Sequence, residues 1–201
     1  MNYSYKLSIS TEGALKADLS KYYESQTSYD LDQYKQNGSK IPFQVFQTPT
    51  SELFNQEWLD AVQEKIPTKL QPWCMVFHRA EGPMYKRAHV DVAPYDPPVA
   101  FHSGLNFTLT ENDTTEMVWY DRTDGTEFDI TDMKTYINVE YDSLAEKERA
   151  VIGSENLVLV NTSTYHDVDN KEQERWCVSL RTDMDFDSWE NTVEAYRGLF
   201  T

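Results

Sequence analysis

Short runs of β-forming residues, separated by clusters of Gly, Pro, Asn and Asp, fill most of the chain after residue 70. The runs span residues 71–80, 84–90, 99–110, 115–121, 133–139, 156–162 and 174–183. Several short strands at this spacing, with turn residues between them, are typical of all-β domains. The pattern therefore predicts a mostly β fold, a β-sandwich or a barrel, with helices at its flanks.

The segments around the β-rich part complete one domain of 201 residues, a length that can bury a core. We expect a strand at 3–9, a helix at 13–24, a surface loop at 25–39 and a strand at 41–47. Ser51 is expected to cap a helix that Pro67 ends, with an apolar face of Phe54, Trp58, Val62 and Ile66. Further helices are expected at 143–151 and 187–197. Residues 1–70 are thus an N-terminal α/β elaboration, 71–183 the β core and 184–201 a C-terminal helix.

Composition narrows the classes of partner. The formal net charge of -16 and the sequence pI near 4.5 argue against a protein that binds phosphate backbones, so no nucleic-acid partner is expected. Cys74 and Cys177 each lie in an apolar segment and are expected to be core thiols of a protein from a reducing compartment. The N-terminus lacks the pattern of a signal peptide, and no run of about 18 apolar residues occurs. We expect a soluble cytoplasmic protein with no membrane partner; its oligomeric state stays open.

Two histidines and an aspartate carry the pattern of a metal site. His89 and Asp91 are two positions apart, which on an extended strand places both side chains on one face. His166 follows the apolar run 157–160, 75 residues beyond Asp91, and is expected in a turn. Two imidazoles and one carboxylate leave one side of a metal open, an arrangement that suits Fe(II) and oxygen activation. Zinc would more usually recruit thiolates or a third histidine. Each residue alone is more commonly a core or surface residue than a ligand.

Arg175 adds an anion-binding residue to this pattern. It lies nine positions after His166, at the start of the apolar run 176–180. Strand alternation places Arg175, Cys177, Ser179 and Arg181 on one face and Trp176, Val178 and Leu180 on the other. A guanidinium facing the interior needs an anionic partner, and a carboxylate fits its planar fork. The alternative is an ordinary ion pair with Glu172, Glu174 or another of the acidic residues.

Together, the H-x-D pair, the distant histidine and the arginine nine residues after it resemble the Fe(II)/2-oxoglutarate-dependent oxygenase superfamily. The spacing to Arg175 is similar to that of prolyl hydroxylases. The context of His166 and Arg175 also resembles the aspartyl/asparaginyl β-hydroxylase and free-proline hydroxylase branch, which includes small bacterial and phage members. The resemblance covers roughly residues 71–183.

The resemblance implies a double-stranded β-helix, a jelly-roll or cupin-like barrel, in which His89, Asp91 and His166 hold Fe(II). It further implies that Arg175 takes the 5-carboxylate of 2-oxoglutarate, with ascorbate as a possible support for turnover. Ser179 and Tyr85 are the candidates for a second contact with that carboxylate. Other residues expected near the barrel interior or its mouth are Asn106, Trp119, Tyr95 and Asp96. His78 and His102 lack a partner at ligand spacing and are expected to be structural.

The implied reaction is hydroxylation of an unactivated C–H bond, on a free amino acid or a peptide or protein side chain. Retention of Asp91 favours hydroxylation over halogenation, because related halogenases replace this carboxylate by a small residue. Two alternatives stay open: a cupin-like barrel that binds a metal or small molecule without oxygenase activity, and a jelly roll without a site. A nucleic-acid demethylase of the same superfamily would be expected to show a basic groove, which this acidic sequence does not indicate.

Overall fold

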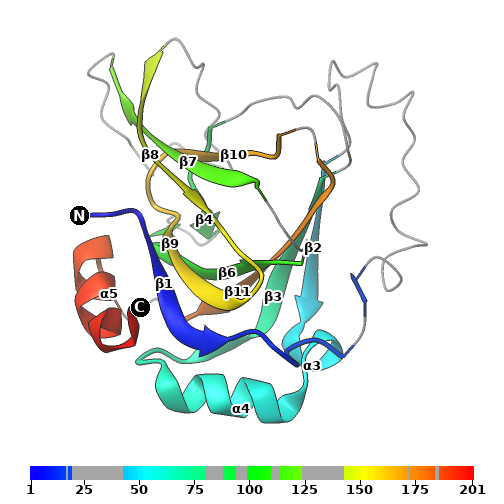
Figure 1. Ribbon diagram of the computed structural model, residues 1–201. Coiled ribbons are helices and arrows are strands. Elements are labelled where there is room, and N and C mark those ends of the chain that lie inside the picture. The colour runs from blue at the N-terminus through cyan, green and yellow to red at the C-terminus, as the bar shows by residue number, and fades with distance from the viewer. Residues whose placement is uncertain are drawn as a thin grey trace.

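Two antiparallel sheets form most of the computed structural model (Figure 1). The structure describes residues 1–16, 18–19, 43–79, 88–93, 99–109, 114–123, 143–171, 173–183 and 186–201. The large sheet has the order β1-β9-β6-β11-β3-β2, with strands Ser4–Ser10, Asn156–Asn161, Ser103–Thr108, Arg175–Thr182, Leu70–Arg79 and Phe43–Pro49. The small sheet has the order β10-β7-β8, with strands His166–Asp169, Glu116–Arg122 and Leu144–Val151. A third, two-stranded sheet pairs β4 (Val92–Ala93) with β5 (Val99–Ala100).

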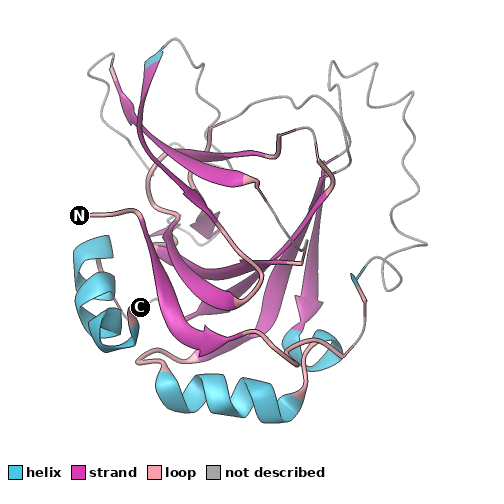
Figure 2. Cartoon of the chain, viewed as in Figure 1, coloured by secondary structure: helices cyan, strands magenta, loops and turns pink. Residues whose placement is uncertain are grey.

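The mostly β composition predicted from the sequence is confirmed, and the described strands form separate sheets rather than one closed barrel. Among the described residues helices are few and lie at the periphery, as Figure 2 shows in cyan. These described helices are α3 (Thr50–Leu53), α4 (Gln56–Lys65), α5 (Trp189–Tyr196) and the short 3-10 helix η3 (Arg197–Leu199). The expected strands at 3–9 and 41–47 and the expected C-terminal helix are present as β1, β2 and α5.

The two faces of the large sheet differ in chemistry. On its outer face Trp176, Val178 and Leu180 join the main apolar cluster, which also contains residues of α4 and α5. The alternate residues of β11 therefore point to the inner face, toward the small sheet. This confirms the alternation predicted for Arg175, Cys177, Ser179 and Arg181. A strand with apolar residues on one face and two arginines on the other is suited to holding a polar site above a dry core.

A second, smaller apolar cluster lies between the two sheets. It combines residues of β7, β9 and β10 with Ile152: Met117, Trp119, Val158, Val160 and Val168. Trp119 is fully buried, and its indole N–H donates to the carbonyl oxygen of Asn161 at 2.8 Å. Tyr3 stacks on the same indole, with ring centroids 6.0 Å apart. Trp119 is therefore a core residue that ties the small sheet to the large one.

The helix expected to begin at Ser51 is divided in two. Helix α3 ends at Leu53 and α4 begins after its N-cap residue Asn55, so Ser51 lies inside α3 and caps nothing. Between the helices Phe54 is extended and forms an isolated β-bridge with Leu15. The backbone pairing of Phe54 with the segment after β1 thus interrupts the helix at this position. The apolar face itself is confirmed, because Phe54, Trp58, Val62 and Ile66 all pack in the main cluster.

The helix expected at 143–151 is wrong, because this segment forms strand β8, the edge of the small sheet. Its Ala, Glu, Lys and Arg residues favour a helix locally, but pairing with β7 overrides that preference. Lys147 pairs with Asp121 at 2.7 Å and Arg149 with Glu116 at 2.8 Å, both on β7. An exposed, charged edge strand of this kind also resists pairing with other chains.

Some expected elements cannot be compared with the structure. The strand at 133–139 and the loop at 25–39 lie outside the described residues, as does most of the strand at 84–90. Most of the helix expected at 13–24 also lies outside them, and the described Leu15 pairs with Phe54 as a bridge.

Replacing Trp119 by Phe should destabilise the fold, because the change leaves a cavity between the sheets and removes the donor to the Asn161 carbonyl. We expect the free energy of unfolding to fall by about 3 kcal/mol. Trp58→Phe is the matched control, since its indole donates to the Ser10 carbonyl at the surface, where water can replace it. Its expected loss is under about 1 kcal/mol. Urea unfolding followed by circular dichroism measures both; equal losses would contradict the role given to Trp119.

Candidate metal centre

His89, Asp91 and His166 converge in the structure. One ligand atom from each residue lies within 4.8 Å of the others. Oδ1 of Asp91 is 3.6 Å from Nε2 of His89 and 3.9 Å from Nε2 of His166. Metal–ligand bonds of about 2.1 Å would bring neighbouring donors roughly 3 Å apart, so a small closing movement would place all three on one ion. The structure thus brings together the three predicted donors, which lie up to 77 positions apart in the sequence.

Backbone pairing brings the two histidines together. His89 and His166 form an antiparallel β-bridge, in which each amide N–H donates to the other's carbonyl at 2.9 Å. The amide of Asp91 donates to the Thr162 carbonyl at 3.0 Å. The sequence predicts His166 in a turn, but in the structure it is the first residue of β10. The segment 88–91 therefore runs beside the start of β10, and the three side chains meet there.

Hydrogen bonding and burial prepare the donors for a cation. Nδ1 of His166 donates to the Thr164 carbonyl at 2.9 Å, in the tautomer that leaves the Nε2 lone pair directed at Asp91. Burial, together with the positive charge that His89 can carry, lowers the pKa of His166 to about 4. Burial opposes ionisation of Asp91, but the Arg181 guanidinium and the two imidazoles outweigh it and lower its pKa to about 2. At neutral pH His166 is neutral and Asp91 is charged, as metal ligands must be.

Arg181 is a site residue that sequence reasoning placed on the correct face but gave no role. Its Nη2 donates to Oδ2 of Asp91 at 2.7 Å, while Oδ1 of the same carboxylate faces the two histidines. The guanidinium also lies over the ring of Phe101, 5.2 Å from the centroid. Arg181 thereby occupies one carboxylate oxygen and leaves the other for a metal. A second arginine on the inner face of β11 was the sequence signal for this contact.

Buried polar atoms without hydrogen-bond partners lie beside the ion pair of Arg181 with Asp91. Within the described part of the chain, Oδ1 of Asn106, Oγ of Ser179, and Nε and Nη1 of Arg181 are buried without a hydrogen bond. They converge over Gly104, where a Cβ would lie 2.8 Å from Oγ of Ser179 and 3.0 Å from Oδ1 of Asn106. Leaving a buried polar group unpaired costs about 1–3 kcal/mol, so such a group suggests a missing partner. The N–H groups of Arg181 and the Ser179 hydroxyl can donate to oxygen atoms of a small polar ligand next to Asp91, and Oδ1 of Asn106 can accept from a hydroxyl or amine.

Arg175 is buried at the other end of the same strand face. Its side chain is 3% exposed, and its Nε–H donates to Oγ1 of Thr115 at 3.0 Å. Glu174, one of the acids expected to compete for it, instead binds His78 at 2.9 Å; Glu172 lies outside the described residues. Arg175 makes no ion pair with any residue that the structure describes. A buried guanidinium with only a hydroxyl partner is suited to receive an anion.

The remaining predicted residues fall into three groups. Tyr85, Tyr95 and Asp96 lie outside the described residues. Ser179 and Asn106 lie on the inner face directly opposite each other, nearer to Arg181 than to Arg175 along the strand. His78 stacks on Trp176 with ring centroids 4.0 Å apart, on the outer face, which agrees with a structural role. Burial lowers the pKa of His102, and no described contact links its ring to the metal ligands.

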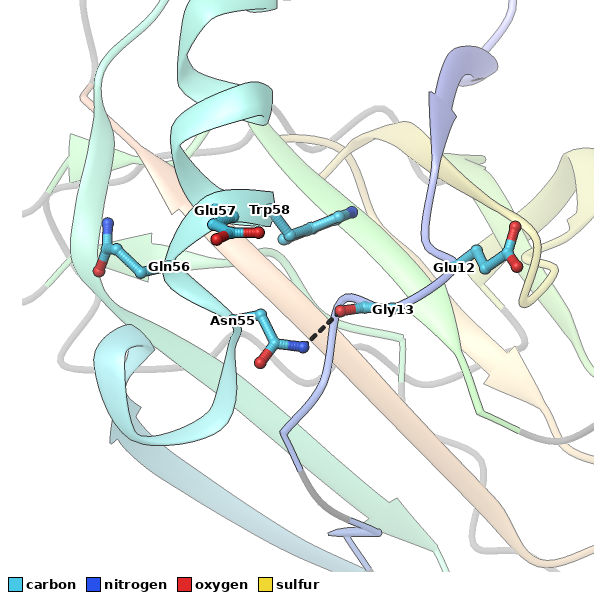
Figure 3. A pocket seen from close by; sticks show the side chains of 6 residues that line it. All are labelled: Glu12, Gly13, Asn55, Gln56, Glu57 and Trp58. Carbon is cyan, nitrogen blue, oxygen red and sulfur yellow. Dashed lines mark hydrogen bonds between the residues drawn. The ribbon is translucent and has the colours of Figure 1, made fainter.

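A surface hollow of about 500 Å³ lies away from these residues (Figure 3). It is lined by Glu12, Gly13, Asn55, Gln56, Glu57 and Trp58. The Asn55 amide donates to the Gly13 carbonyl at 2.6 Å and the Trp58 indole to the Ser10 carbonyl at 2.9 Å. These hydrogen bonds hold the segment at the end of β1 against α4. We therefore assign the hollow a structural role rather than a ligand-binding one.

Neither a protein-family model nor a curated protein matches the chain. Among the described residues, no helix is both long and apolar enough to cross a membrane. The chemical interpretation of the site therefore depends on the geometry of its own residues.

Acid should destabilise the metal-free protein through His166. Its pKa is 6.5 without the fold and about 4 within it, so the unfolded chain binds the proton more readily. Stability is therefore lost as the pH falls from 6.5 toward 4. We expect the contribution of His166 to lower the free energy of unfolding by about 2 kcal/mol between pH 7.5 and pH 5. Urea unfolding in the presence of a chelator should show this difference for the native protein and a clearly smaller one for His166→Asn. Parallel pH profiles would contradict the assignment.

Proposed function

We propose that this protein is an Fe(II)- and 2-oxoglutarate-dependent oxygenase that hydroxylates an unactivated C–H bond. The observation that carries the proposal is a two-histidine, one-carboxylate donor set on the same inner surface as a buried arginine that has no acidic partner among the described residues. Two histidines and one carboxylate suit an Fe(II) ion that keeps coordination positions open for a co-substrate and oxygen. The arginine suits the far carboxylate of a dicarboxylate co-substrate.

His89, Asp91 and His166 would hold the iron. Both imidazoles present Nε2, and Asp91 would bind through Oδ1 because Arg181 already holds Oδ2. With only three protein donors, an iron ion held here would keep room for a co-substrate and oxygen. When bound, iron and 2-oxoglutarate would supply the oxygen chemistry, with 2-oxoglutarate converted to succinate and carbon dioxide. The protein's own residues hold the ligands in place, orient them and keep water away.

The order of the strands supports a double-stranded β-helix. Strands β6, β9 and β11 lie in the large sheet, whereas β7, β8 and β10 lie in the small one. The chain therefore passes from one sheet to the other between β6 and β7 and again at each step from β8 to β11. The bridge between His89 and His166 adds the segment 88–89 next to β10. This winding agrees with a jelly roll whose metal lies between the sheets at one end.

The co-substrate would bind along the inner face of β11. Arg175 and Arg181 are six positions apart, roughly 20 Å along a strand, and both long side chains reach inward from near its ends. Arg181, Ser179 and Asn106 provide unpartnered polar atoms near the metal, and Arg175 provides the far cation. Tyr85 stays a candidate for a further contact. The substrate we favour is a free amino acid or a peptide or protein side chain, and Asp91 favours hydroxylation over halogenation.

The native protein should release succinate from 2-oxoglutarate in air with Fe(II) and ascorbate. His89→Ala should abolish iron-dependent release, because only two donors remain. His78→Gln is the matched control, a buried histidine on the outer face of the sheet that should retain activity. Iron binding without succinate release, across broad pools of amino acids and peptides, would instead favour a metal-binding barrel of the cupin type.

Arg175→Met should weaken 2-oxoglutarate binding by at least about tenfold, because a charged hydrogen bond contributes about 1.5–3 kcal/mol. Fe(II) affinity should change little, since Arg175 contacts none of the three donors among the described contacts. His166→Ala should show the opposite pattern, with loss of iron. Arg197→Met, at an exposed arginine of η3, controls for the loss of a positive charge. Anaerobic titration measures both affinities; equal loss of iron in Arg175→Met and His166→Ala would contradict the assigned roles.

A further inference from the structure

A half-buried aromatic pair lies beside the candidate metal centre. Trp73 is on β3, and Phe101 lies between β5 and β6. Their rings meet edge to face, with centroids 6.5 Å apart and an angle of 74° between the ring planes. Aromatic pairs prefer this arrangement over a face-to-face sandwich. The two rings therefore form a corner of apolar surface.

The contacts that position Asp91 also position Phe101. The amide N–H of Phe101 donates to the Asp91 carbonyl at 3.0 Å, and the Phe101 carbonyl accepts the Thr162 hydroxyl at 2.7 Å. The Thr162 carbonyl in turn accepts the amide N–H of Asp91 at 3.0 Å. The guanidinium of Arg181, which binds the Asp91 carboxylate, lies over the Phe101 ring. The aromatic pair is therefore held in a fixed position next to a predicted metal ligand.

The inner face of β3 continues this apolar surface. Met75 pairs in register with Ser179 of β11, so both side chains point to the inner face. Trp73 is two residues earlier on β3 and shares that face, whereas Cys74 joins the main apolar cluster on the outer face. Across the described segments, the two apolar clusters include none of Trp73, Met75 and Phe101, and all three are half-buried. We call these three residues the apolar wall.

The chemistry of the apolar wall favours an apolar group. Trp73 offers one N–H donor, and the side chains of Met75 and Phe101 offer no strong hydrogen-bonding group. A polar side chain covered by the wall would lose water without a full set of partners, whereas an apolar side chain gains free energy as its surface leaves water. A cationic group is also disfavoured, because the Arg181 guanidinium already lies over the Phe101 ring. An aliphatic or aromatic side chain fits this surface better than an acidic, amide or basic one.

We propose that Trp73, Met75 and Phe101 bind the apolar side chain of an amino-acid substrate, free or within a peptide, beside the metal site. This inference rests on the proposed function and extends it, because it narrows a substrate class that the proposed function leaves open. Hydroxylation would then fall on an aliphatic or aromatic residue. Acidic and amide side chains, such as those of aspartate and asparagine, would be poor substrates.

Leucine and asparagine provide a matched pair of probes, because their side chains have the same branching and the same number of non-hydrogen atoms but differ in polarity. Each is used as the free amino acid and as its N-acetyl amide, which stands for a residue within a peptide. Affinity is measured by anaerobic titration of the whole chain loaded with Fe(II) and 2-oxoglutarate, so that no turnover is needed. At least one form of leucine should bind the native protein about tenfold or more tightly than the same form of asparagine.

Met75→Gln places an amide on the apolar wall with little change in side-chain length, and it should lower the ratio of leucine to asparagine affinity about fivefold or more. Met75→Leu keeps the surface apolar and should retain the ratio. Trp73→Ala should weaken leucine binding by a similar factor. Trp58→Ala is the matched control, at another half-buried tryptophan on α4, and should leave leucine binding unchanged. The affinities for Fe(II) and 2-oxoglutarate should stay close to native in all four variants.

A native protein that binds Fe(II) and 2-oxoglutarate but prefers asparagine, or binds leucine in neither form, would overturn the role of the apolar wall and leave the proposed function standing. An affinity ratio that is the same in Met75→Gln and Met75→Leu would have the same consequence. A native protein that binds Fe(II) but not 2-oxoglutarate would overturn the proposed function, and this inference with it.

Discussion

The reciprocal backbone pairing of His89 with His166 is the interaction on which the candidate site depends. It joins a segment that follows the large-sheet strand β3 to the first residue of β10 in the small sheet. Backbone hydrogen bonds, rather than side-chain contacts, fix the positions of both histidine main chains. The imidazoles then need only the correct rotamer, which the Thr164 carbonyl sets for His166. A site held by backbone in this way is more rigid than one assembled from loops.

The inner face of β11 supplies the charges around that site. Its apolar alternate residues lock the strand into the main core, so the arginines cannot retreat to solvent without loss of packing. Arg181 takes one oxygen of Asp91, and Arg175 lies at the far end with a hydroxyl partner. The strand therefore does two things: it holds one oxygen of Asp91, the carboxylate of the candidate metal site, and it places the positive charge of Arg175 at a set distance from that carboxylate.

The sequence predicts these features to different extents. Strand alternation correctly assigned both faces of β11, because a period of two depends only on the strand being extended and half of it being apolar. The three donors could be chosen by residue type and spacing, but their convergence required a topology that no local pattern contains. The segment 143–151 was mistaken for a helix because its Ala, Glu, Lys and Arg residues favour one, and only its partner β7 makes it a strand. The link between Arg181 and Asp91 joins residues 90 positions apart, so spacing alone could not reveal it.

The whole chain is acidic, yet several arginines lie buried between its sheets, two of them paired with Asp91 and Asp167. The chain has a formal net charge of -16, and the inner face of its large sheet carries Arg79, Arg175 and Arg181. At physiological ionic strength the field of exposed acids is screened beyond about 8 Å, whereas buried arginines act at close range in a medium that screens little. An acidic surface therefore discourages polyanions such as nucleic acids from accumulating on the protein, yet it need not prevent a small dianion from binding between the sheets. The proposed binding of a small acidic ligand thus depends on where the positive charges lie, not on how many the chain has.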